Sequence, residues 1–280
     1  MYKKGDFHIH TNSSDGKFTP REIIKMAKLE NIDILSVTDH DTIDGLNEAL
    51  KFGDSYKIKV VPGIELSTLY KNQKVHILGY FKNIDQIGVE FRKYLKEMSD
   101  FRIYRAKKIV ENLRNIFKIN LDFDKILEET KGVVARPHIA SAIIKQGYNY
   151  NWNYIFKYLI GENSPAYVPN EKLELIDGIN YLKLNHAVIV LAHPILIENL
   201  NLEELYQMPF DGIEAIYPVN SIKDTKRFKQ AALKYKKIIT AGSDFHGIVK
   251  QDSKHAQKIG KVFLSQDDID IFLEKLDSKI

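Results

Sequence analysis

Short apolar segments alternate along this chain with longer segments of helical periodicity, and this alternation constrains the possible folds most strongly. The strand-like segments are residues 6–10, 34–37, 59–64, 75–81, 187–192, 212–217, 238–241 and 261–264. Most helical patterns lie between them, at residues 43–52, 173–184, 202–208, 221–235 and 268–276. Strand–helix alternation of this kind predicts a parallel sheet covered by helices.

One helix start is explicit in the sequence. Thr19 is a favourable N-cap residue, Pro20 suits the first helical position, and Glu22 follows three residues after the cap. The polar turn at residues 12–16 separates this start from the first strand. We therefore expect the first helix to begin at Pro20.

The middle of the chain interrupts the alternation. Residues 85–118 form one long helical pattern, and residues 120–170 contain no strand-like segment of more than a few residues. A chain of 280 residues is long enough for two small domains, but barrel folds often use about 250 residues as one unit. We expect an α/β barrel built from residues 1–94 and 171–280, with a helical insertion subdomain at residues 95–170.

Composition excludes several classes of protein. The chain has no cysteine, which removes disulfides, thiolate nucleophiles, iron–sulfur clusters and Cys-ligated zinc. Its longest buried-looking apolar run, residues 187–192, is far shorter than a membrane span, and no apolar stretch follows the N-terminal lysines. We expect a cytoplasmic protein without a signal peptide or a membrane partner. The net charge of +4 is compatible with a phosphorylated substrate.

A basic segment at residues 92–118 contains nine Lys and Arg against three Asp and Glu. Interleaved apolar residues predict an amphipathic helix with a basic face. Two interpretations stay open for that face, a solvated surface or a contact with nucleic acid.

Histidines and acidic residues repeat at or near the ends of the predicted strands. The histidines are His8, His10, His40, His76, His193 and His246, and the acidic residues are Asp15, Asp39, Asp41, Glu65 and Asp244. Each one alone has an ordinary explanation, such as a surface histidine, a turn or a helix cap. In an α/β barrel, however, the carboxyl ends of the strands form one face, so these side chains converge. Imidazoles with carboxylates and no thiolate are typical ligands of Zn, Mn or Fe. His186 and His255 fit none of these positions, and we expect both at the surface.

Six segments in this order resemble motifs of the PHP (polymerase and histidinol phosphatase) superfamily. They are residues 6–16, 36–42, 62–65, 75–80, 192–194 and 242–247. Residues 135–140 and 161–169 are similar to the branch that contains 3′,5′-nucleoside bisphosphate phosphatases and 5′–3′ exoribonucleases. Residues 212–218 also resemble that branch, but they depart from the Glu-Val-Tyr sequence and the downstream histidine expected there.

The resemblance implies a distorted seven-stranded (β/α) TIM-like barrel holding two to three divalent transition-metal ions (Mn, Zn or Fe). It implies catalytic roles for Glu65, Asp244 and His193, and supporting rather than ligating roles for Asp39 and Asp41. The implied ligand sets are His8, His10, Glu65 and Asp244 for one ion, Glu65, His76 and His193 for a second, and Asp15, His40 and His246 for a third. A bridging carboxylate between closely spaced cations suits metal-activated hydroxide attack at phosphorus.

The activity that the resemblance implies is a metal-dependent phosphoesterase that removes a terminal phosphate from nucleotides such as 3′,5′-bisphosphates. Arg136 and His138 would hold the substrate phosphate, with the guanidinium suited to bidentate binding. The expected partner is a phosphorylated small molecule or a short oligonucleotide, with no obligatory protein partner.

Several alternatives stay open. One is a 5′–3′ exoribonuclease acting on short 5′-phosphorylated RNA, and another is a phosphatase of a different small ester such as histidinol phosphate. Amidohydrolase-type chemistry on a carbonyl is a further alternative. A domain that had lost its chemistry would lack ligands, and no ligand position is missing here.

Overall fold

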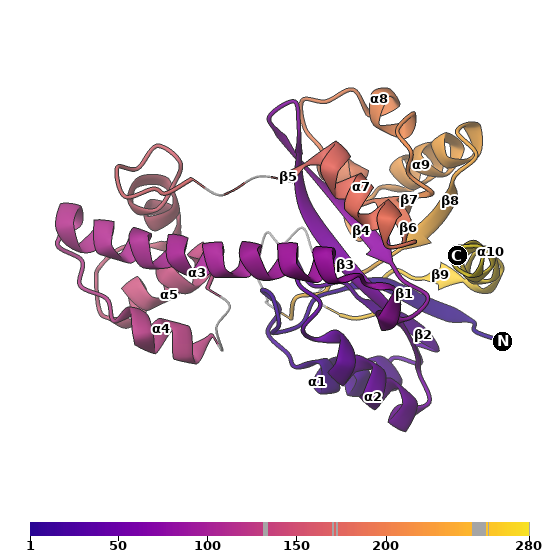
Figure 1. The fold of residues 1–280 in the computed structure, drawn as a ribbon, viewed down its shortest axis with the longest axis horizontal. Coiled ribbons are helices and arrows are strands. Elements are labelled where there is room, and N and C mark those ends of the chain that lie inside the picture. Colours follow the sequence, from indigo (N-terminus) through magenta and orange to yellow (C-terminus); the bar gives the residue numbers. More distant parts are fainter. Residues whose placement is uncertain (131–133, 170, 172, 248–255, 257, 280) are drawn as a thin grey trace. The chain divides into compact units, whose positions relative to one another are not determined.

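The computed structural model describes the chain except for residues 131–133, 170, 172, 248–255, 257 and 280. The chain divides into two compact units (Figure 1). Unit 1 comprises Met1–Arg92 and Lys172–Ile280, and unit 2 comprises Lys93–Glu171. No helix among the described residues is both long enough and apolar enough to cross a membrane.

Unit 1 is built on a nearly closed, barrel-shaped sheet of nine strands, which confirms the predicted α/β barrel. Seven strands run in the order β8-β7-β6-β4-β3-β2-β1, and the two-residue strands β9 and β5 pair with β1 and β3. Backbone hydrogen bonds link β1 to the segment after β8, from His10 N to Phe245 O (3.0 Å) and from Asp244 N to His8 O (2.8 Å). The strands are β1 (Lys4–Ile9), β2 (Ile34–Val37), β3 (Lys59–Tyr70), β4 (Gln73–Tyr80), β5 (Leu173–Glu174), β6 (Val188–Leu191), β7 (Gly212–Ile216), β8 (Ile238–Ala241) and β9 (Leu264–Ser265).

The predicted parallel sheet is present except at β4, which runs antiparallel to both β3 and β6, and at the short β9, which runs antiparallel to β1. The cause at β4 is the turn between β3 and β4. Lys71 and Asn72 both have positive φ angles, of 49° and 60°, as a tight two-residue hairpin turn requires. The predicted strands at 59–64 and 75–81 therefore extend toward each other, to Tyr70 and from Gln73.

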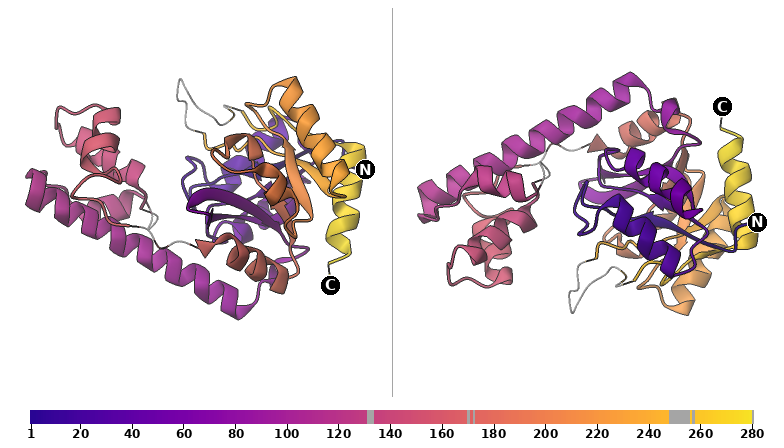
Figure 2. Two further views of the ribbon diagram at one scale, coloured as in Figure 1. Left: turned by 90° about the horizontal axis from the view of Figure 1, so that it is seen from above. Right: turned by 90° about the horizontal axis from the view of Figure 1, so that it is seen from below.

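Helices pack on the outside of the sheet (Figures 1 and 2). The predicted start of α1 is confirmed, because Thr19 and Glu22 cap each other and Pro20 opens the helix. The second helix was expected at 43–52, but it begins at Leu46, after a loop with Asp41 in the left-handed region. The helices and single turns of unit 1 are α1 (Pro20–Leu29), α2 (Leu46–Tyr56), η1 (Ile84–Gln86), α7 (Leu175–Leu184), η3 (Pro194–Leu196), α8 (Leu202–Tyr206), α9 (Ile222–Lys234) and α10 (Gln266–Asp277).

Three aromatic side chains anchor α10 to the barrel. Figure 2 shows this helix near the N-terminus of the chain. The ring centroid of Phe272 lies 4.4 Å from that of Phe7 and 5.1 Å from that of Tyr80. All three side chains are fully buried, and the Tyr80 hydroxyl donates to the Phe7 carbonyl (2.9 Å). This packing fixes β1, the strand that carries the predicted ligand His8 and leads directly to His10.

Unit 2 is helical and has a hydrophobic core of its own. Its elements are α3 (Val89–Phe117), which begins in unit 1, and α4 (Phe123–Glu129), α5 (Arg136–Lys145), α6 (Trp152–Tyr154) and the π-helix η2 (Ile155–Leu159). Ile109 and Leu113 of α3 are fully buried together with Ile139 and Ile143 of α5. The apolar face of the predicted amphipathic helix is therefore core, and its basic residues lie on the other faces.

We expect Phe272→Ala to destabilise the protein by about 3–5 kcal/mol, because it leaves a cavity between α10 and the barrel. The matched control is Ile271→Ala on the same helix, whose side chain is half exposed and should change stability by less than about 0.5 kcal/mol. Chemical denaturation measures both variants, and equal losses would show that the aromatic cluster does not anchor α10.

Candidate metal centre

Unit 1 brings the nine predicted metal ligands together at one edge of the sheet. They come from β1 and the loop after it (His8, His10, Asp15), the loop after β2 (His40), β3 (Glu65), β4 (His76), the loop after β6 (His193) and the loop after β8 (Asp244, His246). His76 lies near the start of β4 rather than at a strand's carboxyl end. The antiparallel direction of β4 explains this position, because its beginning meets the end of β3.

The first group consists of His8, His10, Glu65 and Asp244, all of them buried. The Nε2 atoms of His8 and His10 are 3.1 Å apart. They lie 3.2 and 3.1 Å from Glu65 Oε2, and 3.4 and 3.0 Å from Asp244 Oδ1. Four ligands at ordinary zinc–nitrogen distances around a tetrahedral ion are separated by about 3.3 Å. The spacing of these four atoms therefore fits a transition-metal ion.

Glu65 faces two different sets of imidazoles with its two oxygens. Oε2 lies 3.1 Å from His40 Nδ1 as well as close to the first group. Oε1 lies 3.0 Å from His76 Nδ1 and 2.9 Å from His193 Nε2. A carboxylate in this position can bridge two cations, as the resemblance implies for Glu65.

Unsatisfied polar atoms support the presence of a cation. Glu65 Oε2 is fully buried and forms no hydrogen bond among the described residues, although nitrogens of His8, His10 and His40 lie within 3.2 Å of it. A buried carboxylate oxygen without a partner is costly, and a metal ion removes that cost. The donor set of imidazoles and carboxylates fits Zn, Mn or Fe.

A third group surrounds Asp15, whose carboxylate is 38% exposed. Asp15 Oδ1 lies 3.1 Å from His246 Nε2 and 3.7 Å from His10 Nδ1, and His40 belongs to the same group. The structure thus places His10 near two groups, and His40 near both Asp15 and Glu65. The sequence expectation had assigned each of these histidines to one site.

The site is largely buried and rich in ionisable groups, and this shifts its pKa values. Burial lowers the pKa of His10, but the nearby carboxylates of Asp244 and Glu65 outweigh it and raise that pKa to about 10. At His40 burial prevails and lowers the pKa to about 4. Burial raises the pKa of Glu65, but the surrounding imidazoles outweigh it and hold that pKa well below its usual range. At His10 the metal-free site therefore keeps a proton where a cation would bind, whereas His40 is unprotonated at neutral pH.

Two residues behind the ligands were not identified as site residues from the sequence. Glu214 on β7 is fully buried; its Oε1 lies 2.9 Å from His8 Nδ1, and its Oε2 accepts from the His193 backbone N–H (2.7 Å). The Tyr217 hydroxyl donates to Asp244 Oδ2 (2.6 Å). These contacts orient ligands, as the partners of metal-bound imidazoles and carboxylates usually do. An acidic residue inside an otherwise apolar strand was the available signal for Glu214.

Asp39 and Asp41 support loops rather than joining a ligand group. Asp39 accepts hydrogen bonds from the Thr11 backbone and from the hydroxyls of Thr11 and Ser14, which orders the loop after β1. Asp41 Oδ1 accepts from the Ser67 backbone N–H (2.7 Å).

The backbone is unusual at two predicted ligands. His193 and Asp244 have φ angles of 24° and 50°, in the left-handed region that disfavours residues other than glycine. Strain of this kind concentrates at functional sites, where the surrounding structure enforces it.

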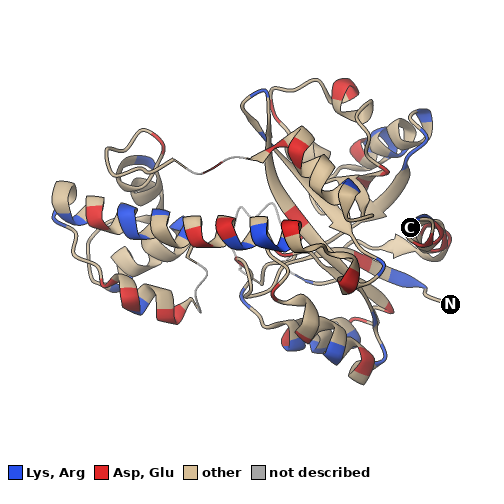
Figure 3. Ribbon diagram, in the orientation of Figure 1, with Lys and Arg blue, Asp and Glu red and all other residues tan. Residues whose placement is uncertain are grey.

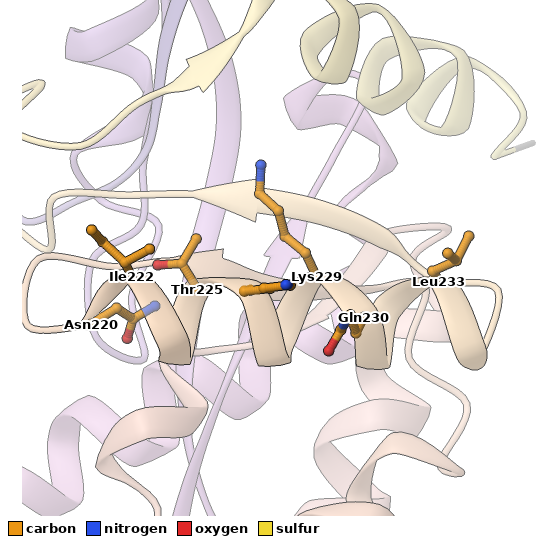
Figure 4. A pocket seen from close by; sticks show the side chains of 7 residues that line it. Asn220, Ile222, Thr225, Lys229, Gln230 and Leu233 are labelled. Carbon is orange, nitrogen blue, oxygen red and sulfur yellow. The ribbon is translucent and has the colours of Figure 1, made fainter.

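The remaining predicted residues are not among the nine ligands. Arg136 and His138 belong to unit 2, where the Arg136 Nη1 donates to Ile160 O (3.5 Å) and His138 Nδ1 accepts from the Ala135 N–H (3.0 Å). His186 is exposed, as expected, and His255 lies outside the described residues. A surface pocket along α9 (Figure 4) contains none of the predicted ligands; it is lined by Asn220, Ile222, Thr225, Lys226, Lys229, Gln230 and Leu233.

Known proteins are similar to this chain over most of its length. The model of the PHP domain family matches residues 6–245. A 5′-3′ exoribonuclease of Haemophilus influenzae is 29% identical over 195 residues, which are 70% of each chain. A 3′,5′-nucleoside bisphosphate phosphatase of Chromobacterium violaceum is 28% identical over 250 residues, which are 86% of each chain.

A solved structure supports the fold. It is a protein of Bifidobacterium adolescentis whose description as a metal-dependent phosphoesterase is itself an inference. It superposes with a TM-score of 0.81 at 24% identity, covering 97% of this chain and 96% of that one.

Glu65→Ala removes both oxygens of the central carboxylate. We expect it to reduce bound metal and to slow phosphate-ester hydrolysis by at least about 100-fold, the upper end of what changing a ligand's supporting partner costs. The control is His186→Ala, an exposed change outside the site, which should stay within a few-fold of the wild type. Elemental analysis and kinetics measure both, and a comparable loss in His186→Ala would contradict the assignment.

Metal affinity should rise with pH. The raised pKa of His10, about 10, means that this imidazole carries a proton at neutral pH in the metal-free protein. A cation that binds there must displace the proton, so binding releases protons and strengthens as pH rises through about 6 to 9. Calorimetry with Zn²⁺ in buffers of different ionisation enthalpy counts the protons released. Affinity that falls over this range would refute the expectation.

Proposed function

The chain belongs to the PHP domain family, and from this premise we propose that it is a metal-dependent phosphoesterase that removes a terminal phosphate from nucleotides such as 3′,5′-bisphosphates. The observation that carries the proposal is the position of Glu65, with separate sets of imidazoles around its two oxygens. The bisphosphate phosphatase of Chromobacterium violaceum, similar over 86% of both chains, supports the substrate class.

We assign the metal-binding role to the nine residues of the candidate centre, which would hold two to three divalent ions (Mn, Zn or Fe). Such ions supply Lewis acidity that stabilises charge on phosphoryl oxygens and makes water a competent nucleophile at neutral pH. The nine residues are His8, His10, Asp15, His40, Glu65, His76, His193, Asp244 and His246. Among them, Glu65, Asp244 and His193 are the proposed catalytic residues.

The other residues of the site prepare these ligands. Glu214 accepts a hydrogen bond from His8 when the imidazole proton is on Nδ1. In that tautomer the unprotonated Nε2 faces Glu65 and Asp244, where a cation would bind. Tyr217 holds one oxygen of Asp244, so the other faces the imidazoles of His8 and His10. The site is thereby arranged before a substrate arrives, which lowers the cost of reaching the reactive geometry.

Arg136 and His138 are proposed to bind the phosphate that does not react. A guanidinium binds a phosphate bidentately, and the Arg136 side chain has its charge unpaired by any carboxylate among the described residues. Holding the second phosphate would position the scissile one and favour a substrate phosphorylated at both ends.

The alternative is a 5′–3′ exoribonuclease that acts on short 5′-phosphorylated RNA, and it is favoured by the relative from Haemophilus influenzae. The same metal ligands would serve either reaction. A phosphatase of another small ester, such as histidinol phosphate, is a further alternative.

A substrate panel tests the proposal. The Mn-loaded protein is assayed on adenosine 3′,5′-bisphosphate, on a short 5′-phosphorylated RNA and on histidinol phosphate. We expect the highest kcat/KM on the bisphosphate, with release of one phosphate, and loss of that activity on chelation. Faster release of mononucleotides from the RNA would support the exoribonuclease instead, and no turnover of any ester would refute both.

Arg136→Ala should lower kcat/KM on the bisphosphate by about ten- to 150-fold, the equivalent of a lost charge-assisted hydrogen bond of about 1.5–3 kcal/mol. Metal content should not change. On p-nitrophenyl phosphate, which has no second phosphate, the loss should be much smaller. Equal losses on the two substrates would mean that Arg136 serves the reacting phosphate, and no loss on either would remove it from the site.

A further inference from the structure

We propose that two helices of unit 1, α9 and α10, carry the two halves of a contact between copies of this chain. In this contact the outer face of α9 on one copy binds the outer face of α10 on another. The proposal concerns assembly and does not depend on the proposed reaction. The outer face of α9 consists of Ile222, Lys226, Lys229 and Leu233, and that of α10 consists of Asp267, Asp270, Ile271 and Glu274, all of them exposed.

The outer face of α9 combines exposed apolar side chains with unneutralised positive charge. Ile222 and Leu233 are 90% and 81% exposed, although large apolar side chains usually face the core. They line the pocket along α9 (Figure 4) and are separated by about 16 Å of helix. Lys226 and Lys229 line the same pocket, and among the described residues the ion pairs of α9 involve other side chains. This face therefore suits an acidic partner that also presents an apolar side chain.

The outer face of α10 has these properties. The helix contains five Asp and Glu against one Lys, whereas α9 contains five Lys and Arg against one Asp (Figure 3). Asp267, Asp270 and Glu274 lie outside the ion pairs of α10 that the structure describes. Ile271 lies among these carboxylates, and half of its side chain is exposed. Spacings of three and four residues place Asp267, Ile271 and Glu274 on one side of the helix.

The two outer faces do not neutralise each other within one copy. Both helices pack on the barrel with their opposite faces, where Phe228 of α9 and Phe272 of α10 are fully buried. The outer faces are consequently left to solvent, with opposite charge and with apolar side chains on each.

A second copy is the occupant that these observations favour, because α10 supplies on one helix the carboxylates and the apolar side chain that the outer face of α9 lacks. Opposite charge brings the faces together and sets their register, and burial of the apolar side chains stabilises the pair. A contact between unlike faces leaves one face of each kind free on every pair. It therefore extends head to tail or closes into a ring.

Analytical ultracentrifugation of the full chain tests the contact. We expect an average mass above that of one chain, increasing with protein concentration. The association constant should fall at least about tenfold between about 0.1 M and about 1 M salt, over which the Debye length shrinks from about 10 to about 3 Å.

Reversing the charge of each face in turn shows which surfaces meet. Lys226→Glu combined with Lys229→Glu should remain monomeric, and so should Asp270→Lys combined with Glu274→Lys, because like charges then oppose each other. A mixture of the two double variants should associate again, since the unchanged α9 of one can bind the unchanged α10 of the other.

Controls on α1 separate the contact from a general effect of surface charge or apolarity. Lys25→Glu combined with Lys28→Glu has the same spacing and the same change in charge at exposed positions, and it should associate like the wild type. Leu233→Ser should weaken association about tenfold, as loss of a buried leucine side chain predicts, whereas Leu29→Ser at the exposed end of α1 should not. Melting temperatures of all variants should match that of the wild type, since every change lies at the surface.

Two results would overturn the proposal. A wild-type chain that stays monomeric at low salt would leave the outer face of α9 to a different acidic partner. Association that survives reversal of the α10 charges would show that α10 is not the second half of the contact.

Discussion

The burial of one carboxylate, that of Glu65, is the constraint on which the rest of the site depends. Its side chain is 1% exposed, and imidazole nitrogens from five histidines lie within 3.2 Å of its two oxygens. A charge buried in this way is tolerated only when opposite charges neutralise it, whether protons on the imidazoles or metal ions. The nearly closed barrel makes this possible, because its strands deliver ligands from distant parts of the sequence to one edge of the sheet.

The stability of the fold and the geometry of the site are connected through β1. At one end Phe7 packs against Phe272 and Tyr80, and next to it His8 and His10 face Glu65. Backbone hydrogen bonds then tie the end of β1 to the loop that carries Asp244. A shift of β1 would therefore move three ligands together, so the packing at α10 serves the chemistry at the opposite edge.

Unit 2 presents a different kind of chemistry. Unit 1 pairs its buried charges with one another, whereas Arg105 and Arg136 share an aromatic ring and carry no carboxylate partner among the described residues. A division of labour follows from this contrast. In our proposal the candidate metal centre would carry out the hydrolysis, and the helical unit would supply the preference for a second phosphate.

The sequence by itself determined the element types, the start of α1 at Pro20 and the set of polar residues at the strand ends. These features depend on local periodicity, capping chemistry and residue type, which neighbouring residues decide. The reversal of β4 depends on a two-residue turn whose φ angles the sequence did not reveal, and it explains why His76 lies early in its strand. The roles of Glu214 and Tyr217, and the pairing of Arg105 with Arg136, were decided by the tertiary structure alone. They join residues from 21 to 206 positions apart, and only folding brings such residues within hydrogen-bonding distance or onto one aromatic ring.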